Sequence, residues 1–126
     1  MNKSLWIKTI ALSGAMCVAL GAFAAHGLDS RLPVKAMATF RTAVLYQFLH
    51  TIALLSLVSL PEDLLVPRRQ ELVAKSWLLG IMLFSGSLYT LVFTGISALG
   101  MITPLGGTAF ICGWLVLFTG AKKRTD

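Results

Sequence analysis

The segment LWIKTIALSGAMCVALGAFAA, residues 5–25, decides the fold class, because it is apolar throughout and its one charged residue, Lys8, lies near its start. Three further segments have the same character and contain no Asp, Glu, Lys or Arg: residues 43–60, 76–94 and 101–120. A helix needs about 20 mainly apolar residues to cross the hydrocarbon core of a bilayer. The sequence therefore predicts an all-α bundle of four transmembrane helices, with approximate spans 5–26, 42–60, 76–95 and 101–121.

The composition agrees with an integral membrane protein. Of the 126 residues, 56% are hydrophobic and 13% are charged, whereas soluble proteins carry about 25% charged residues. This length accommodates four spans with short connections, so residues 1–126 are expected to form a single membrane domain. The net charge of +6 raises the possibility of a nucleic-acid partner. Because the basic residues lie at the ends of apolar spans, we expect no such partner and predict the lipid bilayer instead.

A secretory signal peptide is an alternative interpretation of the N-terminus. Lys3 and Lys8, the apolar run and the sequence Ala22-Phe23-Ala24 are typical of a signal with a cleavage site. Cleavage would leave three spans. The run is longer than a usual signal core and carries small residues at helical spacing, so we favour an uncleaved first span.

The distribution of positive charge predicts the topology. Eight of the 11 Lys and Arg residues lie in the N-terminus, the second connection and the C-terminal tail: Lys3, Lys8, Arg68, Arg69, Lys75, Lys122, Lys123 and Arg124. The first connection holds the other three, Arg31, Lys35 and Arg41. Since cytoplasmic loops are enriched in Lys and Arg, both termini are expected in the cytoplasm of a bacterial cell, with the protein in its inner (plasma) membrane.

Small residues mark the expected contacts between helices. Membrane helices associate through close packing and hydrogen bonds, so small side chains at i, i+4 spacing indicate packing faces. The candidate packing residues are Ser13, Cys17, Gly21, Gly80, Gly86, Gly106, Gly107 and Gly113. Most such faces serve packing within a bundle, and contacts in a homo-oligomer are the alternative.

A polar stripe follows the second predicted span. Lys35, Thr39, Thr42, Tyr46 and His50 fall within about 80° of arc when each residue advances the helix by 100°. Because polar side chains are costly in lipid, we expect this stripe to face the bundle interior or a wet cavity. With polar residues of the other spans, it predicts an intramembrane polar cluster of His26, Tyr46, Gln47, His50, Ser85, Ser87, Tyr89 and Thr103.

Two roles remain open for this polar cluster. The side chains can tie helices together through hydrogen bonds, which contribute roughly 0.6 kcal/mol each on average in membrane proteins. Alternatively, they can form a site for a substrate, an ion or a proton, since an ionisable residue within a membrane is a functional candidate. No span contains an acidic residue, so the carboxylate that usually couples cation or proton transport is missing from them.

The sequence lacks the usual signatures of catalysis. Two histidines on different predicted helices are a weak metal signal, because catalytic zinc generally has three protein ligands. Cys17 and Cys112 lie within separate spans and show no disulfide or metal-ligand spacing. No nucleophile, base and orienting group can be combined into a site. We therefore predict no enzymatic activity, no catalytic residues, no metal and no cofactor.

Four short motifs resemble one family along all four spans. They are GAFAAHG at 21–27, YQFLHT at 46–51, FSGSLY at 84–89 and ITPLGG at 102–107, and in this order they resemble the domain of unknown function 423 family. The resemblance implies a four-helix integral membrane protein with an uncleaved first span. It carries over to His26, Tyr46, Gln47, His50, Ser85, Gly86, Ser87, Tyr89, Thr103, Pro104, Gly106 and Gly107. It implies no biochemical activity.

These observations favour a non-enzymatic structural or interaction protein of the inner membrane, whose polar cluster stabilises the bundle or receives a partner helix. The alternative is a small transporter or channel, which could act as a dimer and would use the Tyr46 and His50 stripe.

Overall fold

The computed structural model describes residues 1–123, which are helical apart from short connections. Each predicted span corresponds to one long helix, and two of these helices contain a π-helical turn. The elements are α1 (Lys3–Phe23), η1 (Ala24–Leu28), α2 (Val34–Val58), α3 (Pro67–Gly80), η2 (Ile81–Ser85), α4 (Gly86–Thr94), η3 (Ser97–Met101) and α5 (Thr103–Gly120). Of these, η1 and η2 are π-helical and η3 is a 3₁₀-helix.

Four helical stretches are long and apolar enough to cross a membrane: Lys3–Leu28, Val34–Val58, Pro67–Thr94 and Ser97–Gly120. The prediction of four spanning helices is therefore confirmed. The second and third helices begin earlier than the predicted spans, which started at residues 42 and 76. Composition marks where the chain becomes apolar, whereas the helices themselves begin beside Pro33 and at Pro67, residues that suit a helix start.

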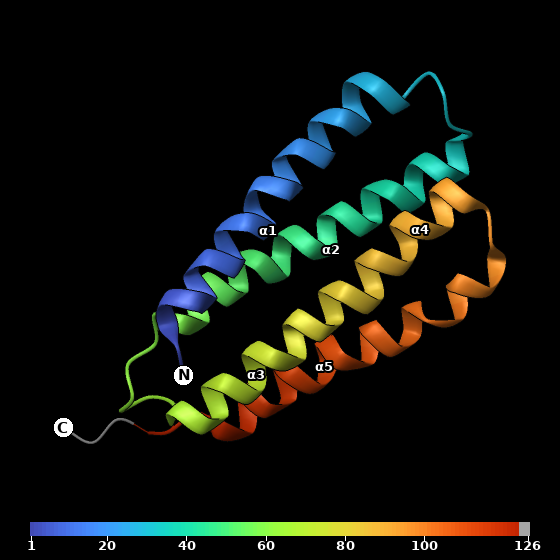
Figure 1. Ribbon diagram of the computed structural model, residues 1–126. Helices are drawn as coiled ribbons and strands as arrows, with labels where there is room; N and C mark the ends of the chain where they lie inside the picture. The colour runs from blue at the N-terminus through green and yellow to red at the C-terminus, as the bar shows by residue number, and fades with distance from the viewer. Residues whose placement is uncertain (124–126) are drawn as a thin grey trace.

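The helices lie side by side in the order α1, α2, α3–α4, α5 (Figure 1). The α1 helix packs on α2, α2 packs on the continuous α3–α4 helix, and α3–α4 packs on α5. As edge helices, α1 and α5 bury the smallest share of their residues. The chain termini and the connection between α2 and α3 lie at the same end of the molecule (Figure 1). There the Lys122 backbone N–H donates to the Leu64 carbonyl at 2.8 Å. Arg124, which entered the charge count, lies outside the described residues.

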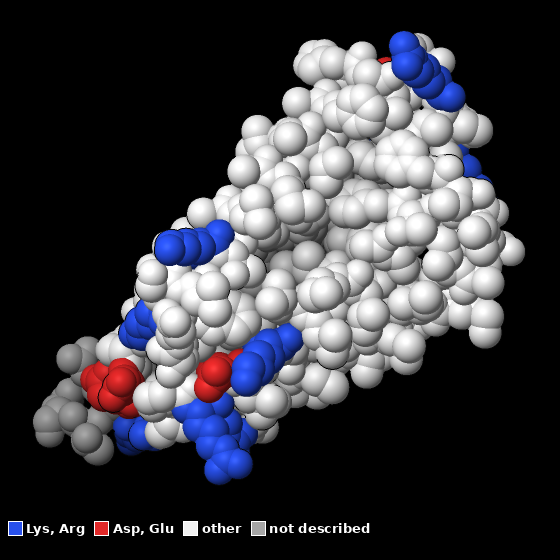
Figure 2. Space-filling view, viewed as in Figure 1, with Lys and Arg blue, Asp and Glu red and all other residues white. Residues whose placement is uncertain are grey.

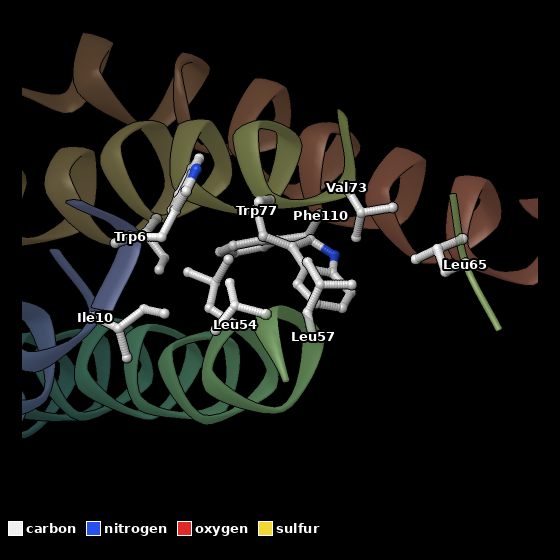
Figure 3. Packing of buried hydrophobic residues seen from close by; sticks show 11 residues of the cluster. Trp6, Ile10, Leu54, Leu57, Leu65, Val73, Trp77 and Phe110 are labelled. Carbon is white, nitrogen blue, oxygen red and sulfur yellow. The ribbon is translucent and has the colours of Figure 1, made fainter. Parts of the chain in front are cut away.

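The main hydrophobic core lies at the end that holds the termini, between α1, α2, α3 and α5. Ile10 extends from α1 toward Leu54 of α2, the ring of Trp6 lies against the α3–α4 helix, and Trp77 lies beside Phe110 (Figure 3). A smaller core closes the opposite end, where Ala24 and Leu28 pack with Met37 and Phe40. Among the described residues, five buried polar side chains lie between these two cores: Gln47, His50, Thr51, Ser85 and Ser87. A sixth, Gln70 of α3, lies at the end that holds the termini and donates to the backbone carbonyls of Leu57 and Leu60.

Three of the expected packing glycines lie where α3–α4 meets α5. A β-carbon on Gly106 would collide with the backbone nitrogen of Phe84, while Gly80 and Gly113 lie against the rings of Phe110 and Trp77. Since no side chain fits at Gly106, glycine is what allows the two helix backbones to approach each other.

The other expected packing residues differ in how tightly they are held. A β-carbon on Gly21 or Gly107 would have its nearest neighbour at 3.9 Å, an ordinary contact distance. Cys17 is buried, and Ser13 lies beside Thr51 of α2. Gly86 departs from the prediction, because a β-carbon there would meet no atom within 4 Å. Gly86 therefore faces open space instead of a neighbouring helix.

We expect Gly106→Ala to destabilise the protein by about 1–3 kcal/mol, because the added methyl forces the α4 and α5 backbones apart. Thermal unfolding of the purified protein in detergent measures this effect. Gly86→Ala is the matched control: its methyl enters open space, and replacing a mid-helix glycine should stabilise the helix by roughly 0.5–1 kcal/mol. Equal unfolding temperatures for the two variants would contradict the close approach at Gly106.

Candidate functional site

A groove of about 250 Å³ lies between α1 and the α3–α4 helix, and Gln47 of α2 lies at its floor. In the space-filling view, the face toward the viewer is hollowed between these two walls (Figure 2). We call this feature the lateral groove. The described residues that line it are all uncharged: Thr9, Leu12, Ser13 and Met16 of α1, Gln47 of α2, and Leu78, Ile81, Met82, Ser85, Gly86 and Tyr89 of α3–α4.

Four side chains form a continuous hydrogen-bonded set at the floor, which we call the Gln47 network: Ser13, Gln47, Thr51 and Tyr89. The Tyr89 hydroxyl donates to Gln47 Oε1 at 2.6 Å. Gln47 Nε2 donates to Ser13 Oγ at 3.2 Å, and Ser13 Oγ lies 2.7 Å from Thr51 Oγ1. Thr51 Oγ1 donates to the Gln47 backbone carbonyl at 2.6 Å. The network thus joins α1, α2 and α4.

The direction of every bond in the Gln47 network follows from counting protons. The single Thr51 hydroxyl proton goes to the backbone carbonyl of Gln47, so Ser13 must donate to Thr51. Ser13 then accepts from the Gln47 amide nitrogen, which leaves the amide oxygen to accept from Tyr89. Each hydroxyl uses its one proton, and one orientation of the amide, with one N–H donated to Ser13 and the oxygen accepting from Tyr89, is consistent with every bond of the set. The floor is therefore fixed by hydrogen bonds within the protein.

The π-helical turn η2 shapes one wall of the lateral groove. Such turns are frequent at functional sites, because an extra residue in the turn redirects the side chains that follow. Ser85, at the end of η2, is fully buried and donates to the Ala43 backbone carbonyl at 2.7 Å. Its neighbour Phe84 instead packs on Tyr46, with ring centroids 4.6 Å apart. Gly86, next in sequence, leaves the groove wall open.

His50 belongs to a separate set of aromatic residues between α2 and α5. The Trp114 indole N–H donates to His50 Nε2 at 3.1 Å, so this ring nitrogen carries a lone pair. The other nitrogen, Nδ1, lies 2.9 Å from the Tyr46 backbone carbonyl and therefore carries the proton. The imidazole also stacks on Phe110 with centroids 3.7 Å apart. This geometry defines a neutral Nδ1–H imidazole that is held on both nitrogens.

The structure divides the eight predicted cluster residues into several groups. Gln47 and Tyr89 share the Gln47 network with Ser85 close by, while His50 lies in the aromatic set. Ser87 and Thr103 pair with each other at 2.6 Å, which joins α4 to the start of α5. The Tyr46 ring stacks on His50 with centroids 6.4 Å apart, but the residue is 39% exposed and its hydroxyl forms no hydrogen bond with any described residue. His26 lies apart from the other seven and is exposed in η1.

The predicted stripe on α2 does not face the interior as a whole. Lys35, Thr42 and Tyr46 are exposed, and of the five stripe residues His50 alone is buried. The Thr42 hydroxyl donates to the Ala38 carbonyl one turn earlier, which removes the cost of facing lipid. The buried side of α2 instead carries Phe40, Ala43, Gln47, His50, Thr51 and Leu54.

Three residues that form hydrogen bonds in these sets were not among the predicted cluster residues. Ser13 was expected only to pack, and Thr51 could have been found because it follows Gln47 by one helical turn. Trp114 has no comparable signal in the sequence, since its partner His50 lies 64 positions away. Within the described residues, no group of three His, Cys, Asp or Glu side chains could hold a metal ion.

The fold defines the class of protein: a small polytopic helical membrane protein with uncharged polar side chains inside its helical layer. The family model described as "Protein of unknown function (DUF423)" matches residues 20–107, and the chain belongs to this family. The resemblance found in the four motifs is thereby confirmed.

Several relatives match nearly the whole chain. A UPF0382 membrane protein of Haemophilus influenzae is 48% identical over 123 residues, covering 96% of each chain. The UPF0382 membrane protein YwdK of Bacillus subtilis is 42% identical over 115 residues, covering 90% of this chain and 92% of the relative. The UPF0382 inner membrane protein YgdD of Escherichia coli is 36% identical over 128 residues, covering 98% of this chain and 93% of the relative. No solved structure matches the chain.

We expect Tyr89→Phe to lower the free energy of unfolding by roughly 0.6 kcal/mol and at most about 1.7, because it removes one hydrogen bond within the membrane. Tyr46→Phe is the matched control and should have no effect, since its hydroxyl has no partner among the described residues. Gln47→Leu should cost more, about 1–3 kcal/mol, because Tyr89 and Ser13 both lose their partner. Unfolding in detergent measures all three. A larger loss from Tyr46→Phe than from Tyr89→Phe would contradict the network.

We further expect ¹⁵N NMR of histidine-labelled protein in bilayers to find His50 neutral, with its proton on Nδ1. The reason is that Trp114 can only donate, which reserves Nε2 as the acceptor. Trp114→Phe removes that donor and should shift the Nε2 resonance, whereas the exposed His26 should keep its signal. A proton on Nε2 in the unmodified protein would overturn the assigned contacts.

Proposed function

We propose that this chain is a non-enzymatic interaction protein of the bacterial inner membrane, which binds a component of the bilayer in its lateral groove. The observation that carries the proposal is a preformed cleft with a fixed floor. The Gln47 network holds α1, α2 and α4 together, and Gly86 leaves the wall between Ser85 and Tyr89 open. A cleft that is already formed in the unliganded chain reduces the ordering that binding requires.

The chemistry of the lining supports binding instead of catalysis. The lining offers hydroxyl groups, one amide and apolar side chains, while the histidine of this region lies in the separate aromatic set with both ring nitrogens engaged. General acid–base catalysis needs a titratable group that can exchange a proton with a substrate, and Tyr89, the titratable residue of the lining, donates its proton to Gln47. The lateral groove thus resembles a surface for recognition within the membrane.

The distribution of the polar groups favours this role over transport. A transport path through the Tyr46 and His50 stripe would need polar groups that are free to bind a solute. The imidazole of His50 is instead held on both nitrogens, and its ring stacks on Phe110 and on Tyr46. The Gln47 network is likewise paired within the protein. Binding in the groove does not require the Gln47 network or His50 to break its hydrogen bonds.

The expected orientation supports a site that is reached from the inner leaflet. Both termini and the α2–α3 connection lie at one end of the molecule, and seven of the described basic residues occur in these segments: Lys3, Lys8, Arg68, Arg69, Lys75, Lys122 and Lys123. By the bias of Lys and Arg toward the cytoplasm, we place this end inside the cell.

We expect Gly86→Leu to fill the lateral groove and to abolish retention of its occupant, while the protein still folds because the side chain enters open space. Native mass spectrometry of protein extracted from membranes in mild detergent would measure the retained mass. Cys112→Leu is the matched control, an exposed position within α5. Retention of the same bound mass by Gly86→Leu and by the unmodified protein would contradict the proposed function.

A further inference from the structure

We infer that the occupant of the lateral groove is an anionic phospholipid of the inner leaflet, with one acyl chain along the groove and its phosphate between Lys8 and Lys75. This inference rests on the proposed function and names the partner of the same site. Its basis is the combination of an uncharged cleft with a basic side chain on each wall at one end.

Lys75 lies in line with the groove wall formed by α3–α4. It precedes Leu78 by three residues and Met82 by seven, and both of these residues line the groove. Residues at these spacings share one face of a helix. Lys75 is exposed and therefore lies where this wall continues toward the end that holds the termini.

Lys8 holds the corresponding position on the opposite wall. It precedes Leu12 by four residues and Met16 by eight, both of which line the groove from α1. Lys8 is exposed and forms no ion pair with any residue of the range 1–123. In the space-filling view, basic side chains occur over both α1 and α3 between the hollow and the end that holds the termini, and uncharged atoms separate them from the hollow itself (Figure 2). An unpaired cation near an apolar cleft is complementary to a phospholipid, because the cation can bind the anionic headgroup and the cleft can bind the hydrocarbon chain.

The length of the groove corresponds to one leaflet. Along its α3–α4 wall the groove extends from Leu78 to Tyr89, eleven residue steps or about 17 Å at 1.5 Å per residue. One leaflet contributes about 15 Å of hydrocarbon, half of the bilayer core. A phosphate held at Lys8 and Lys75 thus leaves room for a chain to extend to the Gln47 network at the floor.

The size of the groove favours a single chain over a transmembrane helix. A helix about 10 Å wide occupies about 1,200 Å³ over a 15 Å length, several times the 250 Å³ of the groove. A partner helix or a second copy would therefore rest on the rim and leave the floor uncovered. A flexible hydrocarbon chain can follow the floor itself.

Glu71 is the acidic residue that opposes this site. Its carboxylate lies 3.4 Å from Lys75 Nζ, one helical turn away, and both side chains are solvent-accessible. Exposed ion pairs of this kind are weak, so a phosphate can compete for the lysine. The pair predicts opposite effects for its two members: loss of Lys75 should weaken binding of an anionic lipid, and loss of Glu71 should strengthen it.

The test is native mass spectrometry of the purified full chain in detergent, titrated with an equimolar mixture of dioleoyl phosphatidylglycerol and dioleoyl phosphatidylcholine. Each basic residue near an anionic lipid contributes about fivefold in affinity, so we expect a preference of about 25-fold for phosphatidylglycerol. Lys8→Gln combined with Lys75→Gln should remove this preference, and Glu71→Gln should raise it by up to about fivefold. Lys35→Gln, an exposed cation at the opposite end, is the control and should leave the preference unchanged.

The outcomes separate this inference from the proposed function on which it rests. Equal retention of both lipids, with both lost in Gly86→Leu, would overturn the anionic phospholipid and leave a binding groove. If the unmodified protein retains a second copy of the chain or another protein, and Gly86→Leu loses it, the anionic phospholipid is likewise overturned and a binding groove remains. If Gly86→Leu changes the retention of no component, the proposed function and the inference both fail.

Discussion

A buried amide within the hydrocarbon layer is the constraint on which the rest of this structure depends. Gln47 is 3% exposed, and no water is available at that depth to satisfy its donors and acceptor. The chain meets this requirement with the Ser13 hydroxyl of α1, which accepts from the amide nitrogen, and the Tyr89 hydroxyl of α4, which donates to the amide oxygen, while Thr51 of α2 holds Ser13. Because these partners come from three helices, satisfying one side chain fixes the relative positions of most of the layer.

Two further contacts connect α5 to the three helices that the Gln47 network joins. Gly106 allows the α5 backbone to approach Phe84, and the imidazole of His50 reaches from α2 to stack on Phe110. The α1 helix, in contrast, packs mainly on α2 and is separated from α3–α4 by the lateral groove. The groove thus exists because the network holds α1 at its floor while no large side chain fills the space beside Gly86. Structural hydrogen bonds and a lateral groove are therefore two consequences of the same set of residues.

Hydropathy was sufficient to predict the four spanning helices, because long apolar segments have few alternatives in a bilayer. It did not predict how α2 is rotated. The polarity of Thr42 and Tyr46 predicted an interior position for both. However, the Thr42 hydroxyl bonds a carbonyl of its own helix, and Tyr46 can face lipid while its ring packs on Phe84. The π-helical turn at Ile81–Ser85 has no local sequence signal. The pairing of His50 with Trp114 has none either, since the two residues lie 64 positions apart. Small residues identified the packing at Gly106, but the same pattern at Gly86 marks an opening.

If the Gln47 network is satisfied by the protein alone, as its hydrogen bonds indicate, it must be dry. Hydrogen–deuterium exchange of the Gln47 side-chain amide, followed by solid-state NMR in bilayers, tests this claim most directly. We expect an amide that remains protected while the exposed amides of the α2–α3 connection exchange, with no magnetisation transfer from water. Rapid exchange of the Gln47 amide, or a strong transfer from water to Tyr89, would mean that water reaches the network, and a transport path would then replace the binding groove as the role of these residues.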